Sequence, residues 1–175
     1  MSRSTINVKG LSELQAFMDQ LPAKLQNNVM RGALRAGIKP MKEMAVANCP
    51  IGDPSETNKR KYNLYAGALR DSIRVSGRID TKNNRVVARV VAGGKTKSGA
   101  NVFYAHMVEF GTRPHALSKG GEVTHPGTAP RPFMRPAIDS QAQNAILAAG
   151  EYIKKRLSTK HGLDTAEIEI GIDEE

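Results

Sequence analysis

The chain has 175 residues, one cysteine, no tryptophan and a formal net charge of +9, and this length is typical of one domain with at most a short arm. The single Cys49 excludes an internal disulfide framework and a zinc site built from cysteines. The first residues lack the apolar core of a signal peptide, and no apolar run approaches the roughly 20 residues that span a membrane, so we expect a protein made in a reducing cytoplasm with no membrane partner.

The charge is unevenly distributed along the chain. Residues 163–175 contain six acidic residues and no basic one, which leaves residues 1–162 with 26 basic and 11 acidic residues, a net charge of +15. A body with this charge attracts polyanions, so nucleic acid is one candidate partner and an acidic protein surface is another. Charge alone does not choose between them.

The N-terminal part predicts a short strand followed by a helix. The segment "STINVKG" alternates weakly between polar and apolar residues. Ser12 begins "SELQ", a capping-box pattern completed by Gln15, which predicts a helix from Ser12 to about Gln20.

A second, longer helix is predicted from Pro22, which suits a first helical turn, to about Ala47. Pro40 lies inside it and should kink it, because proline removes a backbone hydrogen bond. Its apolar residues recur at spacings of three and four: Leu25, Val29, Ala33, Leu34, Ile38, Met41 and Ala45.

The middle of the chain predicts loops around a β-hairpin. Residues 51–64 are polar and contain Lys59, Arg60 and Lys61, which form either a solvated charge run or a contact with DNA or an acidic partner. The segments "LRDSIRVSGRID" and "RVVARVVAGG", joined by "TKNN", predict an antiparallel hairpin.

We expect a flexible loop at residues 93–101. It contains "GKT", the end of a phosphate-binding motif, but the glycine required five positions earlier is replaced by Arg89. The match therefore gives little support for nucleotide binding.

The segment "YAHMVEFGT" (104–112) predicts a helix of about two turns that ends at Gly111, with a strand as the alternative. Helical spacing places the apolar residues on one face and His106 and Glu109 on another. A catalytic zinc needs three protein ligands, and no second closely spaced pair is present. We therefore interpret His106 and Glu109 as a structural or interfacial pair, with a metal or acid–base site as the weaker alternative.

The residues that follow, "RPHALSKGGEVTHPGTAPRPFMRPA", contain five prolines and predict an irregular surface excursion. The last helix is predicted from about Pro132 to Lys160, with Lys154, Lys155 and Arg156 near its negative C-terminal end. Its apolar stripe contains Met134, Ile138, Ala142, Ala145, Ile146, Ala149 and Ile153.

The C-terminal segment alternates Ile168, Ile170 and Ile172 with acidic residues, a pattern typical of a half-buried strand. This strand could pair with its own sheet or with the sheet edge of another subunit. We therefore predict one α+β domain over residues 1–162 and an acidic arm over residues 163–175.

Four segments occur in an order that resembles the small tail-component proteins of long-tailed bacteriophages, the tail-completion or head–tail joining proteins. They are the long helix closed by "VANCP", then "YAGALRDSI" (65–73), "YAHMVEFGT" and "APRPFMRPA" (129–137), and the resemblance covers about residues 10–160. Ala66 stands where the family has threonine, and the gaps after Pro50 and Thr112 are longer than usual.

The resemblance implies an α+β fold in which a small antiparallel sheet packs against a long kinked N-terminal helix and a long C-terminal helix, with extended loops. It implies a structural virion protein, assembled in the host cytoplasm, that forms a ring, sixfold as in phage tails, at the neck between head and tail. Its partners would be a tail-terminator or tail-tube ring, the head connector or head-closure protein, and the DNA in the channel. It implies no enzymatic activity and no cofactor.

Two alternatives remain open. One is a tail-terminator or head-closure ring protein, which would occupy an adjacent layer. The other is a basic nucleic-acid-binding protein, although basic and aromatic residues are not interleaved in the manner that stacks bases.

Three groups of residues are candidates for specific roles. We predict that Tyr104, Phe110 and Phe133 are core anchors of the proline-rich segment, and that the loops at 51–64, 93–101 and 112–131 become ordered only on assembly. Lys59, Arg60 and Lys61 are candidates for facing DNA or an acidic ring. The interface candidates include arginines, which bind carboxylates in bidentate fashion: Arg113, Arg131, Arg135, His106, Glu109, Ile168, Ile170 and Ile172.

Overall fold

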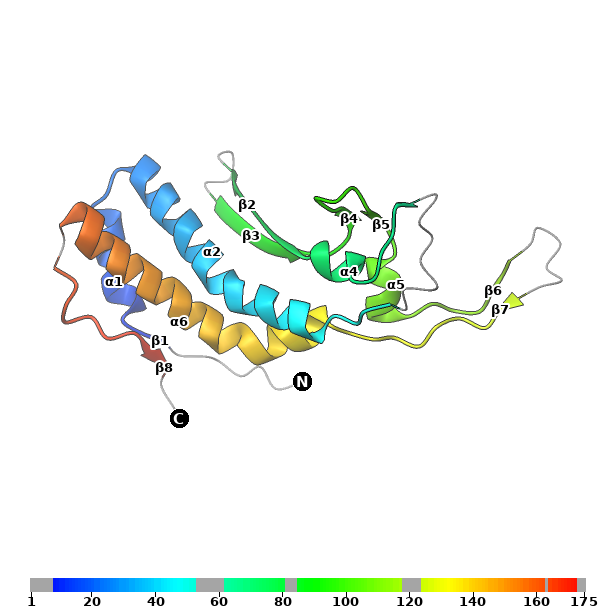
Figure 1. The fold of residues 1–175 in the computed structure, drawn as a ribbon. Helices are drawn as coiled ribbons and strands as arrows, with labels where there is room; N and C mark the ends of the chain where they lie inside the picture. The colour runs from blue at the N-terminus through cyan, green and yellow to red at the C-terminus, as the bar shows by residue number, and fades with distance from the viewer. Residues whose placement is uncertain (1–7, 53–61, 81–84, 118–123, 163, 173–175) are drawn as a thin grey trace. The chain divides into compact units, whose positions relative to one another are not determined.

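The computed structural model describes residues 8–52, 62–80, 85–117, 124–162 and 164–172 (Figure 1). The chain divides into two compact units. Unit 1 comprises residues 1–41, 75–90 and 140–175, and unit 2 comprises residues 42–74 and 91–139. The predicted Lys59, Arg60 and Lys61 lie outside the described residues.

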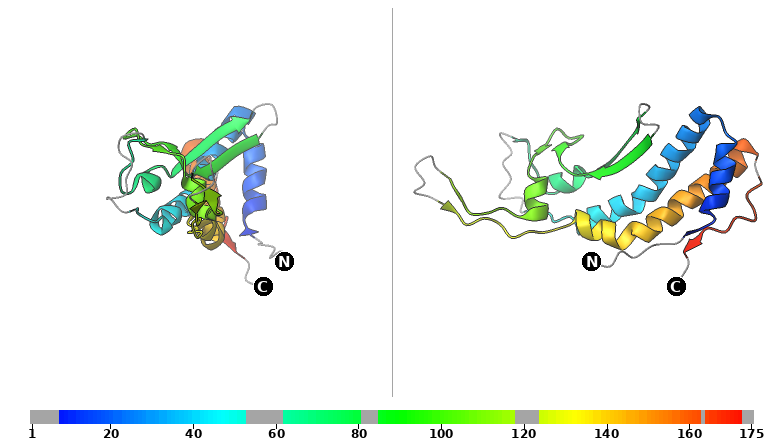
Figure 2. Two further views of the ribbon diagram at one scale, coloured as in Figure 1. Left: turned by 90° about the vertical axis from the view of Figure 1, so that its right-hand side faces the viewer. Right: turned by 180° about the vertical axis from the view of Figure 1, so that it is seen from behind.

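Unit 1 is built around three helices: α1 (Leu11–Asp19), the first part of α2 (Ala23–Asn48) and most of α6 (Met134–His161) (Figures 1 and 2). Both long helices were predicted from their apolar periodicity. Their facing residues form one buried cluster of Leu14, Met18, Val29, Ala33, Ile153, Leu157 and Ile168.

Helices α2 and α6 approach each other closely at a glycine. A Cβ atom at Gly37 would lie 2.5 Å from the carbonyl oxygen of Ala145 and 3.2 Å from the Ala149 side chain. Only a residue without a side chain allows this approach. Pro40 lies inside α2, as predicted.

The predicted capping box at the start of α1 is wrong. The helix begins at Leu11 after Gly10, whose φ of 78° is left-handed, and the Ser12 hydroxyl donates a hydrogen bond to the neighbouring Glu13 carboxylate (2.9 Å). A Cβ atom at Gly10 would lie 2.4 Å from the Glu169 carbonyl oxygen, so the close approach of the C-terminal segment requires glycine here.

That C-terminal segment packs on unit 1 of its own chain. Strand β8 (Gly171–Ile172) pairs antiparallel with β1 (Val8–Lys9), with Ile172 opposite Val8. Ile168 is 8% exposed and the Lys154 ammonium donates to its carbonyl oxygen (2.5 Å). The strand is shorter than predicted, and in the single chain described here its partner is β1.

The predicted central hairpin is present as β2 (Arg74–Asp80) paired with β3 (Arg85–Val91). Residues 93–101 form a second hairpin instead of the flexible loop that we expected. Strands β4 (Gly94–Lys95) and β5 (Asn101–Val102) pair antiparallel, and the Thr96 hydroxyl accepts a hydrogen bond from the Ala100 N–H (3.0 Å).

Unit 2 also contains the short helices α4 (Ala68–Asp71) and α5 (Ala105–Phe110) and the pair β6 (His115–Ala116) and β7 (Thr124–His125). The α+β class is confirmed. In the described part of the chain, the strands form two-stranded sheets in place of one small sheet.

Candidate protein interface

The carboxylate of Glu109 holds the first turn of helix α6. Its Oε2 accepts hydrogen bonds from the backbone N–H groups of Phe133 (2.8 Å) and Met134 (2.9 Å), and its Oε1 accepts one from Arg135 (3.0 Å). The N–H groups of a first helical turn have no partner within the helix. Glu109 thus supplies from α5 the cap that α6 lacks, and it joins the segment "YAHMVEFGT" to "APRPFMRPA".

Burial and hydrogen bonding act on this carboxylate in opposite directions. Glu109 is 7% exposed, and burial raises its pKa, but the three backbone N–H groups and the nearby Arg135 guanidinium outweigh burial and hold the pKa below its usual value. The group is therefore ionised near neutral pH and favourably placed at the positive end of the helix dipole.

The predicted division of this segment into an apolar and a polar face is not observed. Glu109 is buried, whereas the apolar side chains of Met107 and Phe103 are 37% and 47% exposed. Because both Glu109 oxygens bind α6, the predicted pairing of Glu109 with His106 is wrong, and His106 is exposed. Within the described residues no group of three or more His, Cys, Asp or Glu side chains could hold a metal ion.

Side chains in or beside the segment "YAGALRDSI" connect α4 to Gly93, directly before the β4–β5 hairpin. Gly67, with a φ of 91°, precedes α4. The Ser72 hydroxyl, 1% exposed, donates to the Leu69 carbonyl oxygen (2.6 Å) and accepts from the Gly93 N–H (2.8 Å). The Arg74 guanidinium donates to the Gly93 carbonyl oxygen (2.5 Å) and to that of Ser72 (3.1 Å).

Replacing Ser72 with alanine should lower the free energy of unfolding by about 1–2 kcal/mol, because the buried Gly93 N–H loses its hydrogen-bond acceptor. Urea denaturation would measure the change. Ser12→Ala is the control, since that hydroxyl is exposed and bonds only to its neighbour, and it should change stability by less than about 0.5 kcal/mol. Equal effects of the two substitutions would contradict the role assigned to Ser72.

The described residues between Thr112 and Arg131 form an antiparallel arm in place of the irregular excursion that we expected (Figure 1). We define the arm as residues 112–117 and 124–131. At its base, Thr112 and Thr128 exchange backbone hydrogen bonds (3.0 and 3.1 Å), and the Arg131 N–H donates to the Val108 carbonyl oxygen (2.8 Å). Further out, the rings of His115 and His125 stack with centroids 5.1 Å apart.

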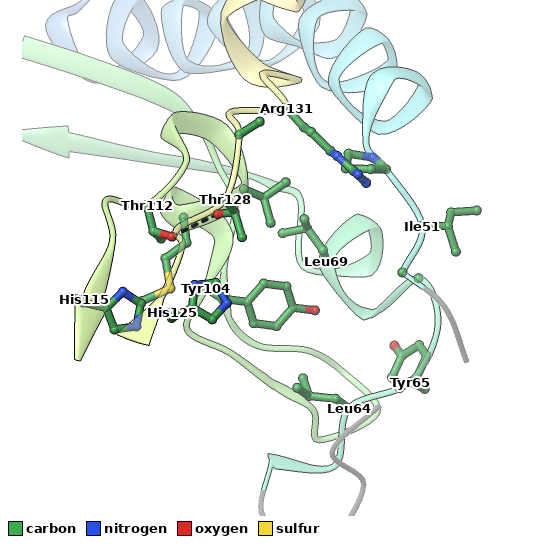
Figure 3. A pocket seen from close by; sticks show the side chains of 16 residues that line it. Ile51, Leu64, Tyr65, Leu69, Tyr104, Thr112, His115, His125, Thr128 and Arg131 are labelled. Carbon is green, nitrogen blue, oxygen red and sulfur yellow. Dashed lines mark hydrogen bonds between the residues drawn. The ribbon is translucent and has the colours of Figure 1, made fainter. Parts of the chain in front are cut away.

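A groove of about 660 Å³ lies beside the base of the arm (Figure 3). Its residues come from the loop after α2, from the α4 and α5 regions and from the arm. They are mostly apolar or aromatic, and none of the described lining residues carries a carboxylate. They include Ile51, Leu64, Tyr65, Leu69, Tyr104, Met107, Val108, His115, His125 and Arg131.

Two of the predicted core anchors lie inward and the third does not. Phe133 is 0% exposed, and Tyr104 is half-buried beside the groove. Phe110 is 71% exposed, so its assignment as a core anchor is wrong. The side chain leaves the core because α5 ends at Phe110 and buries Glu109 instead.

The predicted interface residues lie in different places. Arg113, Arg131 and Arg135 are all exposed, two on the arm and the third in the first turn of α6. Ile168 belongs to the unit 1 cluster and Ile170 packs against it, whereas Ile172 lies opposite Val8 in the β1–β8 pair. The sequence analysis missed the roles of Ser72 and Arg74, although both lie in or beside "YAGALRDSI".

The single cysteine lies inside unit 2. Cys49 is 2% exposed, and burial raises the pKa of its thiol to about 11, although the Arg70 guanidinium acts in the opposite direction. A thiol with this pKa is almost entirely protonated near neutral pH, so it is a poor nucleophile.

Helices that could span a membrane do not occur among the described residues. No curated protein and no solved structure gives a significant match to the chain. A protein-family model described as "Bacteriophage HK97-gp10, putative tail-component" matches residues 12–111, which include all of α1 but its first residue and the whole of α2, α4 and α5. The chain therefore belongs to the HK97-gp10-like family of bacteriophage tail components.

Proposed function

We propose that this tail component forms a ring of identical subunits at the head–tail junction of a long-tailed phage, where it completes the tail and joins it to the head connector. Family membership supports the structural role in the tail. The observation that carries the junction role is the arm, because its exposed outer part is rooted by main-chain hydrogen bonds. A protein that joins stacked layers needs such an element to reach beyond its own packed unit.

The partners in this proposal are other copies of the chain, a tail-terminator or tail-tube ring on one side, and a connector or head-closure ring on the other. DNA would pass through the ring on its way out of the head. The net charge of +15 on residues 1–162 fits a protein that meets DNA or acidic protein surfaces. In this proposal the chain acts in the virion after assembly in the host cytoplasm, and it acts by binding, without catalysis.

Electron microscopy of a lysate from a phage that lacks this gene tests the proposal. We expect filled heads and free tails of normal length that are not joined to each other. Tails of abnormal length would instead identify a tail terminator, and intact joined virions would rule out a required structural role at the junction.

Nucleic-acid binding by the free protein is the alternative from another class, favoured by the net positive charge. A gel-shift series with DNA at increasing salt tests it. Binding by charge alone should weaken steeply with salt, whereas tight binding that persists at 200 mM salt would support a dedicated nucleic-acid site.

A further inference from the structure

We infer that the arm of one copy docks into an acidic hollow on unit 1 of a second copy. This inference rests on the proposed ring, for which it names the contact between neighbouring subunits. It is carried by the opposite charges of two surfaces on the same chain.

The arm is a basic, projecting surface. Arg113 and Arg131, near its base, are exposed, and the rings of His115 and His125 stack on each other further out. The described residues of the arm include no aspartate or glutamate. Leu117, at the outer end of β6, is 60% exposed and adds an apolar contact surface.

The hollow has the opposite charge and also contains apolar side chains. It has a volume of about 840 Å³ and is lined by both kinds of side chain, among them Glu13, Phe17, Asp164, Glu167, Ile168 and Glu169. Asp164, Glu167 and Glu169 are exposed, whereas Ile168 is buried. One basic residue, Lys9, also lines it. A hollow of this size can receive several side chains.

Both surfaces are held by contacts within their own units. The base of the arm is fixed by the Thr112–Thr128 bridge. The hollow is fixed by the Lys154 ammonium, which binds the Ile168 carbonyl oxygen, and by the close contact of Gly10 with Glu169. Little ordering is therefore needed when the arm and the hollow meet, which favours binding.

The arrangement predicts a head-to-tail contact. Two basic arms repel each other, as do two acidic hollows, so a symmetric arm-to-arm contact is disfavoured. A contact between different surfaces of identical chains repeats from copy to copy and closes into a ring where the rotation allows it. Arginine suits this contact because its guanidinium forms paired hydrogen bonds with a carboxylate.

Paired charge reversals test this contact directly. Arg113→Glu with Arg131→Glu makes the arm acidic, and Glu167→Lys with Glu169→Lys makes the hollow basic. Each double variant alone brings like charges together, but the two together restore opposite charges at every contact of an alternating ring. We expect neither variant alone to restore plaque formation to a phage lacking the gene, and the two expressed together to restore it.

Arg85→Glu with Arg89→Glu is the matched control, since both arginines are exposed on β3, outside the two surfaces, and this variant should support plaques alone. Thermal denaturation of each purified variant separates loss of folding from loss of contact. Plaques with either reversed variant alone, or no plaques with two folded variants together, would overturn the inference. Neither result changes the outcome of the gene-deletion microscopy, which tests the junction role independently.

Discussion

Replacing Glu109 with alanine should lower the free energy of unfolding by roughly 2–4 kcal/mol, because the first turn of α6 loses a buried acceptor for three N–H groups. Of these donors, the Phe133 N–H is buried, and so is the Phe133 side chain. The start of α6, "RPFMRP", contains no serine, threonine, aspartate or asparagine that could replace the Glu109 carboxylate as the hydrogen-bond acceptor. Urea denaturation of both proteins measures the loss.

The matched control for this prediction is Glu151→Ala. Glu151 is exposed on the same helix, so its removal should change stability by less than about 0.5 kcal/mol. Glu109→Gln separates charge from shape, since an amide keeps one oxygen acceptor and loses the charge. We expect a smaller loss for Gln than for Ala. Equal stability of the Glu109→Ala variant and the native protein would show that the cap does not stabilise the fold.

The lowered pKa of Glu109 also predicts a dependence of stability on pH. A carboxyl group whose pKa is lower in the folded state than its usual 4.5 stabilises the fold above that value. This contribution is lost as the pH falls below 4.5 through the pKa of the folded state. The difference in stability between the native protein and Glu109→Gln should therefore shrink as the pH is lowered from 6 to 3. A constant difference would mean that the charge of Glu109 contributes nothing.

The elements predicted correctly from the sequence are those with local causes. Helices α2 and α6 follow from apolar residues at spacings of three and four, and the β2–β3 hairpin follows from two apolar runs around a polar turn. The end of α5 at Gly111 follows from the conformational freedom of glycine. Each of these signals lies within a few residues of the structure that it predicts.

The role of Glu109 could not be predicted in this way because its partners are 24 to 26 residues away. A helical face pattern places a carboxylate toward solvent, since a buried charge without partners is unfavourable. The sequence contained one indication of this role. The start of α6 has no capping residue of its own, so its first N–H groups require an acceptor from elsewhere in the chain. The exposure of Phe110 follows from the same contact, which turns Glu109 inward at the end of α5.

The arm was missed for a related reason. Five prolines after Thr112 suggest irregular backbone, because proline cannot donate to a sheet. The paired residues of the arm, Thr112 with Thr128 and His115 with His125, are not prolines, although each lies within two residues of one. Proline next to a short strand pair is compatible with pairing. Which residues pair, however, depends on how the chain folds back and not on the local sequence.

Replacing Gly111 with alanine should destabilise the protein by at least about 3 kcal/mol. Its φ of 72° and ψ of −178° define a region that essentially only glycine adopts. A Cβ atom there would lie 2.5 Å from the Thr128 carbonyl oxygen and 2.9 Å from the Pro130 nitrogen. Since both are backbone atoms of the returning strand, the arm would have to move away from α5.

Amide hydrogen exchange reports on the base of the arm. The Thr112 and Thr128 N–H groups bond to each other's carbonyl oxygens, so both should exchange faster in Gly111→Ala than in the native protein. Gly52→Ala is the control, because a Cβ atom there has no neighbour within 4 Å, and it should leave both rates unchanged. Unchanged exchange in Gly111→Ala would contradict the role of Gly111 at the arm base. Faster exchange would show that Gly111 admits the returning strand of the arm, two residues after the Glu109 carboxylate that caps α6.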